Sequence, residues 1–266
     1  MSTTPAIEFR NVSYRLPDGH GVLHDLTLEV ATGTTVALLG KSGSGKTTLL
    51  RAVNRMHGIS GGDVLVRGRS IFEQEIIALR RSIGYVIQET GLFPHFTVAR
   101  NIGLVLEIEG RSRAQIHDRA CELLEMVGMG AGEFARRMPH ELSGGQRQRV
   151  GLARALAAGQ DILLMDEPFG ALDPLTRAEM QDVLRRLTLE VQRSGARTTV
   201  LLVTHDLDEA LYLAERVVLM EDGRIAANLP AEQFLSSGVP AVQAYVRAVH
   251  REIGRASCRE RVSPSV

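Results

Sequence analysis

The chain has 266 residues, 44% hydrophobic and 23% charged, so it is long enough to bury a sizeable core. Lysine plus arginine and aspartate plus glutamate both number 31, a balance that gives no general attraction to nucleic acid or anionic lipid. Two cysteines without pairing or ligand spacing exclude a disulfide framework and argue against a zinc site. No signal peptide or membrane span is evident, so we expect a cytosolic protein that reaches any membrane through a partner.

The first predicted elements are β-strands. Residues 7–16 and 23–30 alternate apolar and polar side chains around a turn at Pro17-Asp18-Gly19, which is typical of an antiparallel β section. Residues 34–39 (TTVALL) are largely apolar and predict a strand buried on both faces. A glycine-rich loop and a helix over residues 47–56 follow.

Helical periodicity dominates from Gly91 to about Ala158 and predicts a helical lobe. Beyond it, residues 161–165 and 198–204 read as two more buried strands, separated by a long amphipathic helix. Asp206 and Glu209 suit a capping box for the next helix, and Asp222-Gly223 suits the turn of a hairpin. This alternation predicts an α/β fold whose parallel sheet carries an antiparallel β section and a helical lobe.

The glycine-rich loop fits the P-loop pattern GxxxxGK[ST] and lies between a predicted buried strand and a helix. Its backbone N–H groups and the helix N-terminus should point at phosphates. Lys46 should reach the β- and γ-phosphates, and the Thr47 hydroxyl should ligate Mg²⁺. The alternative is a glycine-rich turn without a ligand. The residues concerned are Gly40, Lys41, Ser42, Gly43, Ser44, Gly45, Lys46 and Thr47.

Two acids, Asp166 and Glu167, end the strand that precedes them. In P-loop enzymes an acid at this place holds Mg²⁺, directly or through water. Glu167 is then placed to polarise a water against the γ-phosphate. The alternative is a solvated pair at the end of a strand.

A third motif, residues 142–146 (LSGGQ), precedes a predicted helix and lies at its partly positive N-terminus. Ser143 could simply cap that helix. However, Ser143 lies 23 residues before Asp166 with one helix between them, and this combination identifies a family.

The chain resembles the nucleotide-binding subunit of an ABC transporter over about residues 6–230. GKSGSGKTT, which ends at Thr48, resembles the Walker A motif, LLMDEP the Walker B motif and LSGGQ the family signature. Gln88 matches the Q-loop, residues 171–173 the D-loop and His205 the switch histidine. The resemblance implies a P-loop NTPase (RecA-like) fold over residues 1–253, with the helical lobe at about 91–158.

The resemblance also implies a site that binds ATP and Mg²⁺ and an enzyme that couples ATP hydrolysis to transport. It places Glu167, His205 and Gln88 in catalysis and Thr47, Gln88 and Asp166 at the metal. Each ATP would lie between the P-loop of one protomer and the signature loop of the other, so the second set of ligands is Ser143, Gly144, Gly145 and Gln146.

A narrower resemblance concerns residues 80–102 and 165–177, which look like importers of quaternary-amine osmoprotectants such as glycine betaine, choline and carnitine. It implies a homodimer or paired ATPase subunit, an integral membrane permease and an extracytoplasmic solute-binding protein, without nucleic acid. The chain would then lie at the cytoplasmic face of the bacterial inner membrane. Residues 93–96 are candidates for the permease contact, although they could instead pack on their own lobe. An importer of another small solute, such as an amino acid or a sulfonate, is the alternative.

Two features depart from the family pattern. Leu16 stands where an aromatic ring often lies under the adenine, and Tyr14 could lean toward the base if the segment is a regular strand. Tyr14 could equally be a core or surface residue. Residues 254–266 lack apolar periodicity, so we expect a disordered tail that resembles the read-through end of a truncated gene prediction.

Two rival functions are a soluble ABC ATPase of DNA repair or translation and a regulatory module without turnover. Only 54 positions separate Gln88 from Leu142, which leaves no room for the long coiled coil of the repair types. Translation types usually carry two cassettes in a chain, and this chain has one. Glu167 and His205 argue against a module that does not hydrolyse its nucleotide.

Overall fold

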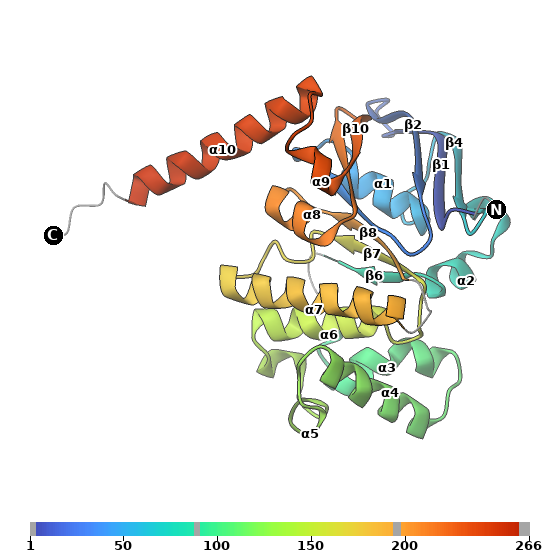
Figure 1. The fold of residues 1–266 in the computed structure, drawn as a ribbon. Helices are drawn as coiled ribbons and strands as arrows, with labels where there is room; N and C mark the ends of the chain where they lie inside the picture. Colours follow the sequence, from blue (N-terminus) through green and yellow to red (C-terminus); the bar gives the residue numbers. More distant parts are fainter. Residues whose placement is uncertain (1–3, 88–90, 194–197, 261–266) are drawn as a thin grey trace.

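The computed structural model describes residues 4–87, 91–193 and 198–260, and its centre is a six-stranded sheet (Figure 1). The strand order is β10-β9-β3-β8-β7-β6, and all pairs except β10-β9 are parallel. The strands are β3 (Thr35–Leu39), β6 (Gly84–Val86), β7 (Ile162–Asp166), β8 (Thr199–Val203), β9 (Arg216–Glu221) and β10 (Arg224–Pro230). The predicted hairpin at Asp222-Gly223 joins the antiparallel pair.

A second sheet is antiparallel throughout and has the order β2-β1-β4-β5. Its strands are β1 (Ile7–Arg15), β2 (Gly21–Val30), β4 (Gly61–Val66) and β5 (Arg69–Ser70). The predicted turn at residues 17–19 connects β1 and β2. Strand β1 is not regular, because Asn11 has a φ of 52° and the register with β2 shifts on both sides of Tyr14.

Burial on both faces explains why the sequence of strand β3 is almost uniformly apolar. All five residues are buried, and successive side chains enter different cores. Val36 and Leu38 join the core formed by the antiparallel sheet and helix α1 (Lys46–Val53). Ala37 and Leu39 join the core under α8 (Leu207–Leu213), α9 (Ala231–Phe234) and α10 (Pro240–Glu260). A parallel strand covered on both faces requires this composition.

The helical lobe shares a core with the other part of the sheet, since Leu163 and Met165 of β7 pack among its buried residues. Its elements are α3 (Val98–Ile108), α4 (Arg113–Met126), α5 (Ala131–Phe134), the 3₁₀ turn η2 (Pro139–Glu141) and α6 (Gly144–Ala155). The remaining elements are η1 (Ile71–Glu73), α2 (Ile76–Arg81) and the long helix α7 (Pro174–Arg193). The predicted α/β fold with an antiparallel section and a helical lobe is confirmed.

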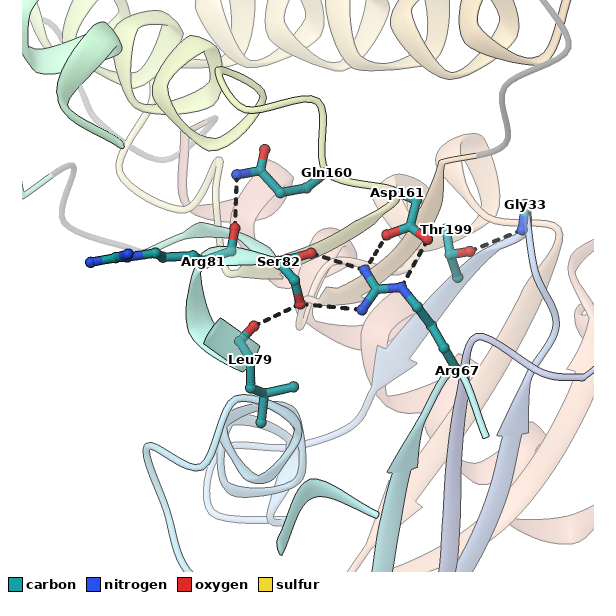
Figure 2. Close-up of polar contacts among 8 residues, drawn as sticks. All are labelled: Gly33, Arg67, Leu79, Arg81, Ser82, Gln160, Asp161 and Thr199. Atoms are coloured by element: carbon teal, nitrogen blue, oxygen red, sulfur yellow. Dashed lines mark hydrogen bonds and ion pairs between the residues drawn. The ribbon is translucent and has the colours of Figure 1, made fainter. Parts of the chain in front are cut away.

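The amino ends of the parallel strands are tied to the antiparallel sheet by Arg67, which lies in the turn between β4 and β5 (Figure 2). Its guanidinium bonds both carboxylate oxygens of Asp161, which lies just before β7, and also donates to the Ser82 carbonyl at 2.9 Å. The pKa of Asp161 is lowered by these hydrogen bonds. Nearby, the Gly33 amide donates to the Thr199 hydroxyl at 2.9 Å.

One local expectation needs correction. Asp206 caps α8 by accepting from the Glu209 amide at 3.1 Å, but the capping box is not reciprocal. The Glu209 side chain is buried, and Thr204 takes its place by accepting from the Asp206 amide at 3.0 Å. The backbone of α10 continues as helix to Glu260. The expected disordered tail covers residues 254–266, of which 261–266 lie outside the described residues, so that expectation stays a prediction.

Candidate functional site

The glycine-rich loop connects β3 to α1 and surrounds the Lys46 ammonium. Only 5% of Lys46 is exposed, and its Nζ donates to the carbonyls of Gly40 and Lys41, both at 2.7 Å. Burial lowers the pKa of Lys46, while the charges of Glu167 and Asp166 oppose that effect. The backbone carbonyls of the loop therefore fix the position of the Lys46 ammonium.

Two glycines of this loop are required by close approach. A Cβ on Gly40 would lie 2.3 Å from the Met220 carbonyl oxygen, and one on Gly45 would lie 2.7 Å from Leu23 Cδ2. Gly45 is also the residue before α1, with a φ of 94° and no side chain to cap the helix. The first amides of α1 thus have no capping side chain, which leaves them able to bind phosphate oxygens.

Asp166 ends β7 beside this loop and is almost fully buried. Its Oδ1 accepts from the Thr47 hydroxyl at 2.8 Å, and its Oδ2 accepts from Arg51 Nη2 at 3.0 Å. Arg51 also donates through Nε to the Tyr85 hydroxyl at 3.1 Å. Burial raises the pKa of Tyr85, although Arg51 opposes the rise. Arg51 and Tyr85 are missed by motif reading, although Arg51 lies four residues after Thr47 and so on the same helix face.

Glu167 and His205 meet at the ends of β7 and β8. Glu167 adopts the left-handed region with a φ of 46°, and its amide donates to the Val203 carbonyl at 3.0 Å. Its Oε2 lies 3.4 Å from His205 Nδ1, and the imidazole is largely exposed. Strained backbone of this kind is typical of functional positions. The structure therefore brings together two of the side chains that the sequence places in catalysis, Glu167 and His205.

The LSGGQ segment begins α6 in the helical lobe. Ser143 accepts from the Gln146 amide at 3.2 Å, and Gln146 Oε1 accepts from the Ser143 amide at 2.9 Å, so a capping box is present. A Cβ on Gly145 would lie 2.2 Å from Thr176 Cγ2, whereas one on Gly144 would meet open space. Buried Gln148 donates to the Pro168 carbonyl and links α6 to the residues after Glu167.

The LSGGQ segment is not joined to the glycine-rich loop of the same chain. Helix α6 belongs to the core of the helical lobe, and α1 belongs to the core under the antiparallel sheet (Figure 1). Among the hydrogen bonds of the described residues, none connects the two segments.

Tyr14 packs inward. Its ring lies 5.8 Å from the ring of His57 and against the core under the antiparallel sheet, while Leu16 is 38% exposed. Because β1 is irregular here, the condition for Tyr14 to lean toward a base from the same face as Leu16 is not met. This packing favours the alternative that Tyr14 is a core residue. Gln88 lies outside the described residues.

Residues 93–96 form a compact turn on the helical lobe. The fully buried Asn101 side chain accepts from the Phe93 amide at 2.7 Å and donates to the carbonyls of Phe93, Phe96 and Thr97. The two phenylalanine rings lie 5.3 Å apart, and Arg100 stacks 4.0 Å from the Phe96 ring centroid. Phe93 nevertheless stays 47% exposed, so the turn presents an aromatic surface.

The geometry suits chemistry on a phosphorylated ligand. A buried cation, uncapped helix amides and a hydroxyl–carboxylate pair lie at the carboxyl ends of the parallel strands, where α/β sheets usually bind ligands. The Glu167 carboxylate and the His205 imidazole lie beside them, 3.4 Å apart. Among the described residues, no group of three or more histidine, cysteine or acidic side chains is arranged to hold a metal by itself.

Comparisons with known proteins agree with this geometry. The family described as ABC transporter matches residues 23–170. The choline transport ATP-binding protein OpuBA of Bacillus subtilis is 44% identical over 82% of this chain and 56% of its own length. The glycine betaine uptake system ATP-binding protein YehX of Escherichia coli is 47% identical over 82% of this chain and 69% of its own. The chain thus spans about half the length of several curated relatives that it matches.

Solved structures give the same fold. A dimeric post-hydrolysis state of the ATP-binding cassette MJ0796, bound to ADP and Pi, has a TM-score of 0.75 and 31% identity, covering 85% of this chain and 98% of that one. CbiO1 of Clostridium perfringens, part of the cbiONQ transporter complex, has a TM-score of 0.79 over 97% of this chain and all of its own, and at 24% identity shows the fold alone. None of the helices in the described ranges is long and apolar enough to cross a membrane.

Proposed function

The chain belongs to the ABC transporter family, and from this premise we propose that it is the ATP-hydrolysing subunit of an importer. The observation that carries the proposal is that four side chains meet at the carboxyl ends of β3, β7 and β8: Lys46, Asp166, Glu167 and His205. Lys46 would bind the β- and γ-phosphates, and Glu167 would polarise the attacking water. His205, 3.4 Å from Glu167, would hold the γ-phosphate and that carboxylate in one geometry.

The residues present fit a Mg²⁺ ion. The Thr47 hydroxyl and the Asp166 carboxylate are hard oxygen donors, and they already approach each other at 2.8 Å. We infer that these two side chains, with Gln88, would hold the ion. When bound, Mg²⁺ would neutralise negative charge that develops on the phosphate during transfer. Arg51 keeps Asp166 Oδ2 engaged, so that Oδ1 faces Thr47.

The second half of each ATP site would come from another protomer. Within one chain the LSGGQ segment and the P-loop belong to different cores, and Gly144 faces open space. The dimeric cassette of the comparison has 31% identity to this chain. In the proposed dimer, the N-terminus of α6 and Ser143 would face the γ-phosphate bound to the partner.

The proposed solute is a quaternary-amine osmoprotectant, because the relatives named above carry choline and glycine betaine in their printed names. The proposal includes membrane permease subunits, an extracytoplasmic solute-binding protein and a position at the cytoplasmic membrane face. The exposed Phe93 turn is the proposed permease contact. Transport of another small solute is the alternative. The ATPase subunit need not touch the solute, so its residues do not determine which solute is carried.

Replacing Glu167 by Gln is the direct test of hydrolysis. The amide cannot accept a proton from water, so steady-state ATP turnover should fall by at least about 100-fold, in the range that general-base catalysis contributes. ATP binding should be kept, and a dimer should accumulate on gel filtration with ATP and Mg²⁺. Glu179→Gln is the matched control, because that glutamate is exposed and pairs with Arg149 at the surface. Wild-type turnover in Glu167→Gln would refute the role of Glu167.

The solute needs a separate experiment. The chain should be reconstituted with its permease and binding protein in vesicles, and ATP turnover should rise when glycine betaine, choline or carnitine is added to the binding protein. Stimulation by an amino acid or sulfonate instead would keep the ATPase proposal and replace the solute.

A further inference from the structure

We propose that Tyr245 of helix α10 is a positioning residue for His205. The Tyr245 hydroxyl donates to the His205 carbonyl at 3.1 Å and thereby fixes the loop that presents the imidazole to Glu167. The inference rests on the proposed function, in which His205 acts at the γ-phosphate. It adds a residue from a helix that carries none of the sequence motifs.

The contact is well defined on the Tyr245 side. Only 7% of Tyr245 is exposed, and its ring packs in the core with Leu207 and Ala210 of α8 and Val242 of its own helix. A buried tyrosine hydroxyl generally needs a polar partner, and the His205 carbonyl serves as one. The ring thus supplies packing, while the hydroxyl supplies a separate and directional bond to the loop.

The loop around His205 is held from three directions. The Thr204 amide donates to the Leu38 carbonyl at 3.1 Å, which ties the loop to β3. Asp206 caps α8 and also pairs with Arg177 at 3.2 Å, which ties it to α7. The bond from Tyr245 attaches the His205 backbone itself to α10.

The position of the imidazole depends on this attachment. The carbonyl carbon of His205 is bonded to the Cα that carries the imidazole, so a displacement of this stretch of backbone displaces the ring as well. His205 Nδ1 lies 3.4 Å from Glu167 Oε2, slightly beyond a good hydrogen bond, so a further shift would separate the two groups. Small displacements of a catalytic group lower the rate of the chemical step strongly.

Replacing Tyr245 by Phe removes the hydroxyl and keeps the ring in the core. We expect kcat for ATP hydrolysis to fall about three- to tenfold with KM for ATP within about twofold, because the lost interaction acts on the chemical step. The matched control is Tyr212→Phe, which also removes a phenol hydrogen bond, here to Asp182 on the surface of α7. That control should leave kcat unchanged.

Two further variants separate positioning from packing. Val242→Ala loosens the contact of α10 with the body while keeping the Tyr245 hydroxyl, so it should lower the thermal midpoint and keep kcat. In a His205→Ala background, measured by single turnover, adding Tyr245→Phe should cause no further loss, because the hydroxyl acts through His205.

Each outcome bears on one proposal. An unchanged kcat in Tyr245→Phe, an equal loss in Val242→Ala, or a full additional loss in the His205→Ala background would overturn the positioning role. A wild-type chain that binds ATP with Mg²⁺ but never hydrolyses it, even with permease and binding protein, would overturn the proposed function instead.

Discussion

Strand β7 has an aspartate at each end, and each carboxylate pairs with an arginine, but the two pairs differ. Asp161, before the strand, is half exposed and bonds Arg67 through both oxygens. Asp166, at the end of the strand, is buried and divides its oxygens between Thr47 and Arg51. The amino-end pair connects two sheets, whereas the carboxyl-end pair holds the carboxylate that we propose as a ligand of Mg²⁺.

The same contrast extends to neighbouring polar groups. Among the described residues, four buried side-chain atoms lack a hydrogen-bond partner, and three of them lie around the carboxyl ends of the strands: Ser44 Oγ, Arg177 Nε and Glu209 Oε1. The fourth is Gln160 Oε1 at the amino end. Buried polar groups without partners are costly, and Ser44 Oγ belongs to the glycine-rich loop, where a ligand could supply the missing partner.

The largest effect should come from removing one charge at each end of β7. Asp166→Asn should lower steady-state ATP turnover by at least about 100-fold, because the neutral amide is a poor ligand for the ion that neutralises the phosphates. Asp161→Asn should keep turnover within about twofold, because that carboxylate only joins two sheets. Equal losses in the two variants would abolish the functional distinction between the ends.

The next prediction concerns how Glu209 makes the free energy of unfolding depend on pH. Burial raises the pKa of Glu209 to about 7, with the charge of Asp206 adding to the rise. Since this folded-state pKa lies above the unfolded value, the stability tied to the protonated acid is present below about pH 4.5 and lost as pH rises through 7. The free energy of unfolding of Glu209→Gln, relative to that of the wild type, should therefore rise by about 2 kcal/mol between pH 5 and pH 8.

Urea unfolding at both pH values measures that gain. Glu179→Gln is a suitable control, since its carboxylate is exposed and pairs with Arg149 at the surface. A difference between wild type and Glu209→Gln that is the same at pH 5 and pH 8 would show that Glu209 is ionised in the fold at both.

Replacing Arg67 by Met should cost about 1 kcal/mol of unfolding free energy, because the pair is partly exposed and solvent screens it. ATP turnover should be unchanged. Arg69→Met is the matched control, since no hydrogen bond or ion pair of its guanidinium occurs among the described residues. A loss of turnover in Arg67→Met with stable folding would mean that the joint between the sheets also acts on the site.

The smallest expected effect is on the free energy of unfolding at low pH. The pKa of Asp161 is lowered in the fold by Arg67, so its contribution to stability is present above the unfolded value and is lost as pH falls through the folded value. The difference in unfolding free energy between wild type and Arg67→Met should shrink below about pH 4. A difference that grows with acid would show that other groups dominate the pair.

Much of the molecule could be predicted because its signals are local. The P-loop, the buried strands and the hairpin at Asp222-Gly223 depend on residues within a few positions of one another. Arg67 and Tyr245 could not be predicted, because their partners Asp161 and His205 lie 94 and 40 residues away. For Tyr14, the spacing argument depended on a regular strand, and the register shifts on both sides of Tyr14 remove that condition.

The cap of α8 shows the same limit within a local motif. Asp206 and Glu209 have the spacing of a capping box, and the aspartate fulfils its part. The glutamate instead enters the interior, where Gln181 and Thr204 lie near it. Spacing can identify which residues are able to meet, but packing decides which of the available partners each one takes.

The clamp that Asn101 places on residues 93–96 has a mechanical consequence. A turn whose amide and carbonyls are already held by one buried side chain has little conformational entropy left to lose when a partner docks against it. Such a turn is rigid, so a partner that displaces the Phe93 ring would also displace α3 and the helical lobe rather than the turn alone. A flexible turn of the same composition would bind a partner yet transmit little of its motion.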